Sequence, residues 1–164
     1  ATATATTTAT ATAEKSTTAS SVPADARSTA ASASPPGYLA QHNLLDQIPE
    51  LRADVDVPEY AALCERDEPI LNAWLGPAGT VSTLHQDPYD NFLCQVVGYK
   101  WLVLVDPRYS AQLYPRDPPL SNTSQVDVGS PAYGAFPEFH SVPLLHCELG
   151  PGDILFIPKG WWHF

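Results

Sequence analysis

Residues 80–88 read TVSTLHQDP, and this short stretch combines a strand pattern with the side chains of a metal site. β-Branched residues dominate its first part and predict a strand over residues 80–85. In extended backbone, residues i and i+2 project to the same face, so His85 and Asp87 point together while Gln86 points away. One imidazole and one carboxylate provide two ligands of a three-ligand site.

A second stretch, PGDILFIPKGWWH at residues 151–163, supplies the candidate third ligand, His163. It reads as a turn, a strand over 154–157 and a second turn before the histidine. Two histidines and one carboxylate on one side of a metal leave its other side open, which is the ligand set of non-haem iron(II) oxygenases. Zinc accepts the same donors, and the spacing does not separate the two metals.

The metal interpretation depends on context, because an isolated H-x-D triplet occurs in many surface loops. A lone histidine beside tryptophan is also more often packed in a core than bound to a metal. Here the triplet ends a predicted strand, precedes a proline, and is matched by the late histidine behind a Pro-Gly-Asp turn. This combination favours the metal site. We treat His42, His140 and His146 as non-metal because no second ligand lies at a useful spacing.

The remaining pattern is one of short strands joined by tight turns. A long excursion rich in proline, serine and asparagine interrupts it at residues 106–142, and excursions of this length are usually functional or inserted. Gly98 and Tyr99 form a short turn between two strands, which predicts a hairpin. Short strands without intervening helices indicate an antiparallel sandwich or barrel. The other predicted strands are residues 71–75, 92–97, 101–105 and 144–149.

The composition divides the chain of 164 residues into two parts. Residues 1–36 consist almost entirely of Ala, Thr, Ser and Pro, so burial cannot offset the entropy of ordering them, and we expect a disordered segment. Residues 37–164 are long enough for one folded domain. The chain contains no methionine and stops directly after the late histidine motif. We therefore expect a catalytic domain that is incomplete at its C-terminus.

The formal net charge of -10 argues against direct binding to nucleic-acid phosphates and favours a basic peptide partner. The sequence contains no apolar run long enough to cross a bilayer and no signal-peptide pattern, so a membrane is not an expected partner. Three cysteines without dense spacing predict free thiols rather than a disulfide scaffold. An intracellular location, nuclear or cytoplasmic, is the expectation. The sequence does not indicate an oligomeric state.

Several longer strings recur in order in one known family. Residues 37–164 resemble the jumonji-C family, a far more specific match than the ligand triplet alone. The matching strings are YLAQH at 38–42, DQIPEL at 46–51, NAW at 72–74, LHQDP at 84–88, NFL at 91–93, LYP at 113–115, NTSQVDV at 122–128 and PGDILFIP at 151–158.

The resemblance implies an all-β fold, a double-stranded β-helix or cupin-like jelly roll with a few short flanking helices. It implies Fe(II) as cofactor, with 2-oxoglutarate and O2 as co-substrates. His85, Asp87 and His163 carry over as the iron ligands. Lys100 carries over as the partner of the distal carboxylate of 2-oxoglutarate, which agrees with the cost of burying a lysine without a partner. A solvent-exposed lysine in the hairpin turn is the alternative for this position.

The resemblance assigns further residues to the co-substrate pocket. Hydrogen bonds to 2-oxoglutarate would come from Tyr38, Ser82 and Asn91. Gln41 and Trp74 would line the pocket, although an aromatic or amide side chain near a cleft can equally be part of the core.

The expected activity is therefore a 2-oxoglutarate-dependent dioxygenase that hydroxylates protein side chains, of the arginyl hydroxylase type. Demethylation of histone methyl-lysine at the same active site is the alternative. The absence of a histone-reading module or zinc-finger cysteines favours hydroxylation. A non-catalytic cupin-like interaction module and a zinc enzyme are alternatives of other classes. The expected partner is a basic protein or peptide, such as a histone tail or a ribosomal or chromatin-associated protein.

Overall fold

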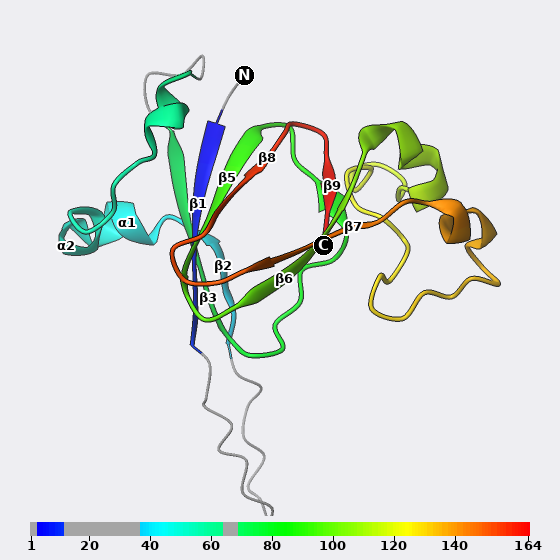
Figure 1. Ribbon diagram of the computed structural model, residues 1–164, viewed down its shortest axis with the longest axis horizontal. Helices are drawn as coiled ribbons and strands as arrows, with labels where there is room; N and C mark the ends of the chain where they lie inside the picture. The colour runs from blue at the N-terminus through cyan, green and yellow to red at the C-terminus, as the bar shows by residue number, and fades with distance from the viewer. Residues whose placement is uncertain (1–2, 12–36, 64–68) are drawn as a thin grey trace, which may run out of the picture.

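The computed structural model describes residues 3–11, 37–63 and 69–164, and it is built mainly from two β-sheets (Figure 1). One sheet has five strands in the order β2-β3-β1-β5-β8, and the other has four in the order β4-β9-β6-β7. The strands are β1 (Ala3–Ala11), β2 (Leu39–His42), β3 (Ile70–Pro77), β4 (His85–Gln86), β5 (Asp90–Val97), β6 (Lys100–Val105), β7 (Leu145–Leu149), β8 (Ile154–Ile157) and β9 (Trp162–His163).

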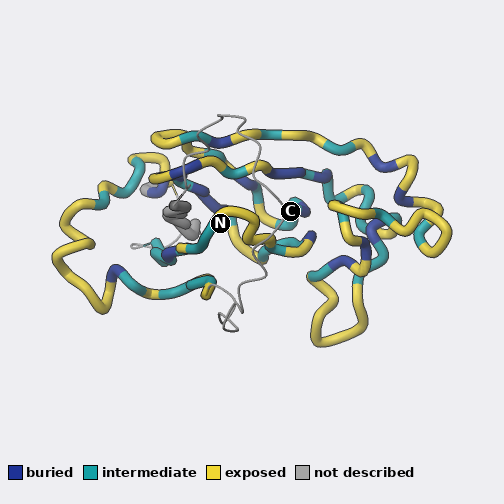
Figure 2. The backbone as a smooth tube through the Cα atoms, turned by 90° about the horizontal axis from the view of Figure 1, so that it is seen from below, coloured by how far each residue is buried: buried dark blue, intermediate teal, exposed yellow. Residues whose placement is uncertain are grey.

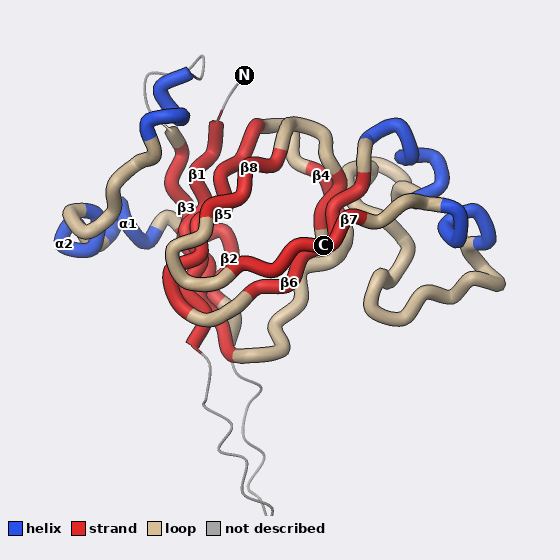
Figure 3. Tube along the Cα trace, viewed as in Figure 1, coloured by secondary structure: helices blue, strands red, loops and turns tan. Residues whose placement is uncertain are grey.

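Short helices flank the sheets on two opposite sides (Figure 3). On one side lie α1 (Leu44–Gln47), α2 (Pro49–Arg52) and the 3-10 helix η1 (Glu59–Leu63). On the other lie the 3-10 helices η2 (Pro107–Leu113) and η3 (Pro137–Ser141). The predicted all-β, cupin-like architecture with a few short flanking helices is confirmed. None of the helices in the described ranges has the length and apolar character needed to span a bilayer.

The alternating pattern of β6 explains how the four-stranded sheet packs on both faces. Leu102 belongs to an inner cluster with Leu93 and Ile157 from the opposite sheet. Val103 and Val105 belong to a second cluster on the other face of β6, and both are fully buried. Successive side chains of a strand point to opposite faces, so a strand that reads as one apolar run can fill two cores.

The excursion over residues 106–142 covers the outer face of the four-stranded sheet. Its buried side chains, among them Leu113 and Phe139, pack with Val103 and Trp162 in the second cluster, between exposed stretches of loop (Figure 2). The indole Nε1 of Trp162 donates a hydrogen bond of 2.8 Å to Ser110 Oγ in η2. The excursion therefore completes a core that it shares with β6 and β9, and it buries the strand that ends in His163.

The structure corrects the expectation of disorder for part of residues 1–36. Ala3–Ala11 forms β1, which lies between β3 and β5 and runs parallel to both. Because each neighbour provides a row of backbone hydrogen-bond partners, a segment with few large apolar residues can still be ordered as a strand. The prediction considered side-chain burial and left out this backbone pairing. Residues 12–36 lie outside the described residues.

Two local predictions are also wrong. β5 pairs with β1 and β8, whereas β6 pairs with β7 and β9, so the predicted hairpin at Gly98 is a corner between two sheets. Gly98 has φ of 75°, a conformation that glycine adopts without strain. The predicted strand over 80–85 is reduced to β4, and the residues before it form a loop. Cys94 and Cys147 are free thiols as expected, and Cys64 lies outside the described residues.

Candidate metal centre

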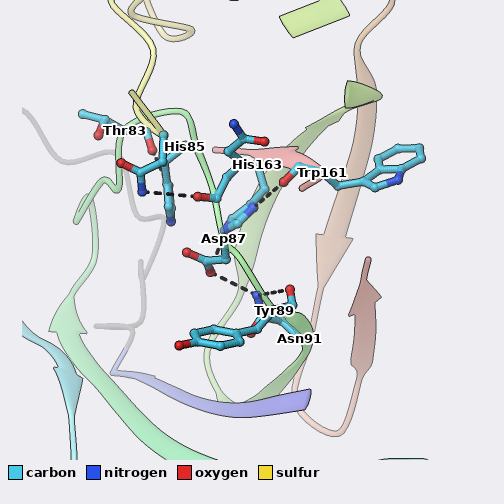
Figure 4. A network of polar contacts seen from close by, with 9 residues as sticks. Thr83, His85, Asp87, Tyr89, Asn91, Trp161 and His163 are labelled. Atoms are coloured by element: carbon cyan, nitrogen blue, oxygen red, sulfur yellow. Dashed lines mark hydrogen bonds and ion pairs between the residues drawn. The ribbon is translucent and has the colours of Figure 1, made fainter. Parts of the chain in front are cut away.

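Two histidines meet because the last strand of the chain pairs with the strand that carries the H-x-D triplet. β4 and β9 are antiparallel, and their register places His85 directly opposite His163. The two imidazole ring centroids lie 4.2 Å apart. Asp87 follows β4, and its Oδ2 atom lies 3.8 Å from His163 Nε2 (Figure 4). One ligand atom from each of these three residues lies within 4.8 Å of the others.

Backbone carbonyl groups orient both imidazoles. His85 Nδ1 lies 2.7 Å from the Thr83 carbonyl oxygen, and His163 Nδ1 lies 3.1 Å from that of Trp161. Because a carbonyl oxygen only accepts, each Nδ1 is the donor, and in the neutral ring the lone pair is then on Nε2. Such hydrogen bonds fix the ring and the tautomer of metal-binding histidines. The Nε2 atoms of His85 and His163 are therefore oriented to bind a metal ion.

A hydrogen bond from the Asn91 side chain orients the carboxylate of Asp87. Asn91 lies on β5 and is only 6% exposed, and its Nδ2 atom donates a hydrogen bond of 3.0 Å to Asp87 Oδ2. The same amide lies 3.5 Å from the Tyr89 carbonyl oxygen (Figure 4). The carboxylate that would bind a metal is thus held by a buried side chain of the opposite sheet.

The excursion holds β4 from the side opposite to β9. The Gln86 backbone N–H donates to the Asn122 carbonyl oxygen at 2.9 Å, and the Ser124 N–H donates to the Leu84 carbonyl oxygen at 2.9 Å. An isolated bridge joins His85 to Thr123. A strand of two residues would be mobile alone, but here it is paired on both edges, so the excursion contributes to the position of His85.

Burial and neighbouring charge favour the neutral form of His163. Removal from water, together with the nearby His85 ring, lowers the pKa of His163 to about 4. A neutral imidazole is the form that binds a metal ion, so this histidine does not have to release a proton at neutral pH.

The three residues border a cavity of about 350 Å³ that also holds most of the predicted co-substrate residues. Lys100 lines it from the start of β6, and burial lowers the pKa of its ammonium group. The alternative of a solvent-exposed turn lysine does not fit this placement. The predicted residues that line the cavity are Tyr38, Trp74, Ser82, Asn91 and Lys100.

Gln41 does not line the cavity, so this part of the prediction is wrong. The residue is exposed, and it lies at a shift in register between β2 and β3. Its φ of 49° places it in the left-handed region, where the alternation of strand side chains is interrupted. A sequence reading that assumes regular alternation from Tyr38 onward therefore misplaces its side chain.

The donor set fits iron(II). Two imidazole nitrogens and one carboxylate oxygen converge from one side and face an open cavity, and this arrangement suits a metal that must accept further ligands. The indole Nε1 of Trp74, which also lines the cavity, is buried without a hydrogen-bond partner within the described ranges. Buried donors without a hydrogen-bond partner are uncommon in native proteins, and a bound ligand can supply the missing acceptor.

Sequence reasoning missed the groups that orient the ligands. Thr83 and Trp161 act through backbone carbonyl oxygens, so their side chains carry no signal. Asn122 lies far from the metal ligands in sequence. The wall formed by residues 76–81 was also missed, because the loop was predicted to be a turn and a strand. The spacing offered one signal for these carbonyl groups. In both cases the carbonyl oxygen that orients the imidazole belongs to the residue two positions before the histidine.

Comparison with known proteins identifies the family of the chain. Residues 2–164 match the cupin-like domain family. The chain belongs to this family. Among cupin-like relatives, Lysine-specific demethylase 8 of Xenopus tropicalis is 53% identical over 131 residues, covering 78% of this chain and 30% of the relative. Lysine-specific demethylase 8 of Danio rerio is 51% identical over 131 residues, covering 78% of the chain and 32% of the relative.

A third cupin-like relative carries the jumonji name. Jumonji C domain-containing protein 5 of Drosophila melanogaster is 43% identical over 131 residues, covering 77% of this chain and 33% of the relative. The resemblance to the jumonji-C family is therefore confirmed. The chain spans about a third of the length of these relatives.

Proposed function

We propose that this protein is an Fe(II)- and 2-oxoglutarate-dependent dioxygenase that oxidises a side chain of another protein. One observation carries the proposal: two imidazoles and one carboxylate converge at a cavity that also contains a buried lysine. The metal ligands account for the iron, and the lysine accounts for an acidic co-substrate. A simple interaction module would need neither feature.

His85, Asp87 and His163 would hold the iron through the two Nε2 atoms and one carboxylate oxygen. When bound, iron(II) supplies the chemistry in which O2 and 2-oxoglutarate are converted to succinate and CO2 while one oxygen atom enters a substrate C–H bond. The hydrogen bond that His85 donates to the Thr83 carbonyl oxygen, and the one that Asn91 donates to Asp87, keep these ligands oriented before a metal binds. Preorganised ligands lose little further freedom on binding.

Lys100 would bind the distal carboxylate of 2-oxoglutarate. Burial disfavours its charged form, and a carboxylate of the co-substrate would favour that form through a charge-assisted hydrogen bond. Ser82 and Tyr38 line the same cavity and would supply hydroxyl groups to the co-substrate. Asn91 donates to Asp87 and would also lie beside the bound acid.

The outcome of the reaction depends on the substrate. Hydroxylation of an N-methyl carbon releases formaldehyde and removes the methyl group, whereas hydroxylation of a chain carbon leaves a stable alcohol. The names of the two relatives called Lysine-specific demethylase 8 support demethylation of methyl-lysine, and we propose this outcome in place of the arginine hydroxylation expected from the sequence. The net charge of -10 supports a basic substrate such as a histone tail in the cell interior.

The test uses the full-length protein, purified without oxygen and supplied with Fe(II), 2-oxoglutarate and candidate basic peptides. We expect succinate formation together with loss of a methyl group and release of formaldehyde, measured by mass spectrometry. A gain of one oxygen atom on an arginine residue would show hydroxylation and would overturn the proposed demethylation. The His85→Ala variant should form no succinate, whereas His140→Ala, which alters an exposed histidine, should retain turnover.

Metal analysis and ligand-binding measurements distinguish the dioxygenase from a non-catalytic interaction module and from a zinc enzyme. A protein that binds Fe(II) and 2-oxoglutarate but forms no succinate with any peptide would be an interaction module. Zinc retained through anaerobic purification in stoichiometric amount, with no activity on iron addition, would support the zinc enzyme. Either result would overturn the dioxygenase proposal.

A further inference from the structure

The Tyr38 ring lies against a backbone position that has no room for a side chain. A Cβ atom built on Gly76 would lie 2.6 Å from Tyr38 Cδ2 and 2.8 Å from Thr80 Oγ1. Both distances are far below an ordinary van der Waals contact of about 3.5–4.0 Å. Gly76 therefore leaves the space that the aromatic ring occupies.

The pairing of β2 with β3 explains this contact. Leu39 pairs with Leu75 in an antiparallel register, which places Tyr38 opposite Gly76 at the end of the ladder. An aromatic ring that folds over a cross-strand glycine covers its exposed backbone, and this arrangement is known to stabilise sheets. The Tyr38 ring also contacts Trp74 on β3, with ring centroids 5.9 Å apart.

Thr80, the second residue that a side chain on Gly76 would meet, is held in place by hydrogen bonds. The Thr80 hydroxyl donates a hydrogen bond to the Pro77 carbonyl oxygen, and the Thr80 backbone N–H lies 3.3 Å from the same oxygen. The turn after β3 is thus closed against the strand. A methyl group on Gly76 would meet an aromatic ring on one side and this turn on the other.

The residues at this contact all line the cavity of the metal centre: Tyr38, Trp74, Gly76, Pro77 and Thr80. We propose that Gly76 is a positioning residue, which acts by seating the Tyr38 ring on the cavity wall and thereby shapes the pocket for the co-substrate. The inference rests on the proposed function only in naming 2-oxoglutarate as the molecule in that pocket. Gly76 is not in the left-handed region, so its requirement is for space and not for a special backbone conformation.

The first experiment is independent of any cofactor. Tyrosine nitration of the full-length protein, located by mass spectrometry, reports how accessible Tyr38 is. We expect Gly76→Ala to increase nitration of Tyr38 severalfold, because the displaced ring loses its half-buried position. The control Gly134→Ala adds a methyl group at an exposed glycine with nothing within 4 Å, and it should leave Tyr38 unchanged. Equal nitration in both variants would overturn the inference.

The second experiment measures binding of 2-oxoglutarate to the Mn(II)-loaded protein by calorimetry. Gly76→Ala should weaken binding by about fivefold or more, which corresponds to the loss of one ordinary hydrogen bond, while Mn(II) affinity stays the same. In a Tyr38→Ala/Thr80→Ala background, the same substitution should have little further effect, because both side chains that the added methyl group would meet are gone. An effect of Gly76→Ala that persists in that background would overturn the inference.

The two experiments keep the inference separate from the proposed function. If the wild-type protein binds Mn(II) but no 2-oxoglutarate, the proposed function fails, and the nitration result still decides the role of Gly76. If Gly76→Ala does not fold, a variant that also lacks both neighbouring side chains decides. A folded Gly76→Ala/Tyr38→Ala/Thr80→Ala protein supports the steric role of Gly76, and an unfolded one refutes it.

Discussion

Replacement of Lys100 by methionine tests whether this buried lysine holds the co-substrate. Methionine keeps much of the length and apolar volume of the side chain and removes its charge. A hydrogen bond to a charged group contributes about 1.5–3 kcal/mol, so the Kd for 2-oxoglutarate should rise about 10- to 150-fold. Metal binding should change little, because Lys100 is not one of the three converging ligands.

The free protein should behave differently from the complex. Burial lowers the pKa of Lys100, because removal from water disfavours its charged form. The difference in free energy of unfolding between Lys100→Met and the wild type then measures what this charge contributes to the free protein. Lys159→Met removes a charge from an exposed turn and serves as the matched control for both measurements.

Calorimetric titration with 2-oxoglutarate and urea unfolding give the two quantities. A Kd within twofold of the wild type would refute the assignment of Lys100 to the distal carboxylate. A large loss of stability in the free protein would show instead that the lysine is a structural residue.

The remaining predictions concern metal affinity, pH and thiol reactivity. Asn91→Ala removes the donor that holds Asp87, so Mn(II) affinity measured without 2-oxoglutarate should fall about 10- to 100-fold, and an unchanged affinity would show that the hydrogen bond does not orient the ligand. The free folded protein keeps His163 neutral down to about pH 4, whereas the unfolded imidazole is protonated below about 6.5, so the unfolded state binds more protons between these values. Stability to urea should therefore rise between pH 4 and 6.5 by about 3 kcal/mol more in the wild type than in His163→Gln, and parallel curves would contradict this assignment. Burial raises the pKa of Cys94, so iodoacetamide should modify it far more slowly at pH 8 in the folded protein than in urea, and equal rates would show that the thiol is exposed.

The sequence was sufficient to single out three side chains that converge in the structure, His85, Asp87 and His163, because local geometry and order along the chain agree. His85 and Asp87 are two residues apart, and such residues point the same way in an extended chain. His163 follows a strand and a turn that bring it back to β4, and the register then places the two histidines opposite each other. The longer family strings identified the fold with more certainty than any single triplet could.

The sequence failed where structure depends on contacts that side-chain pattern does not encode. Gly98 has the same signature in a hairpin and in a corner between two sheets, and only the pairing partners distinguish them. Gln41 is itself the irregular residue of β2, and its left-handed φ interrupts the alternation of side chains. Residues 3–11 lack the apolar side chains that predict burial, yet two strands pair with their backbone. In each case the deciding interaction is between backbone groups far apart in sequence.

The most direct test of the metal centre is a crystal structure of the full-length protein loaded with Mn(II) without oxygen, with the metal located by anomalous scattering. We expect one strong peak bound by the Nε2 atoms of His85 and His163 and by a carboxylate oxygen of Asp87, with the opposite side open to the cavity. A peak elsewhere, or a structure in which His163 lies away from the other two residues, would contradict the account.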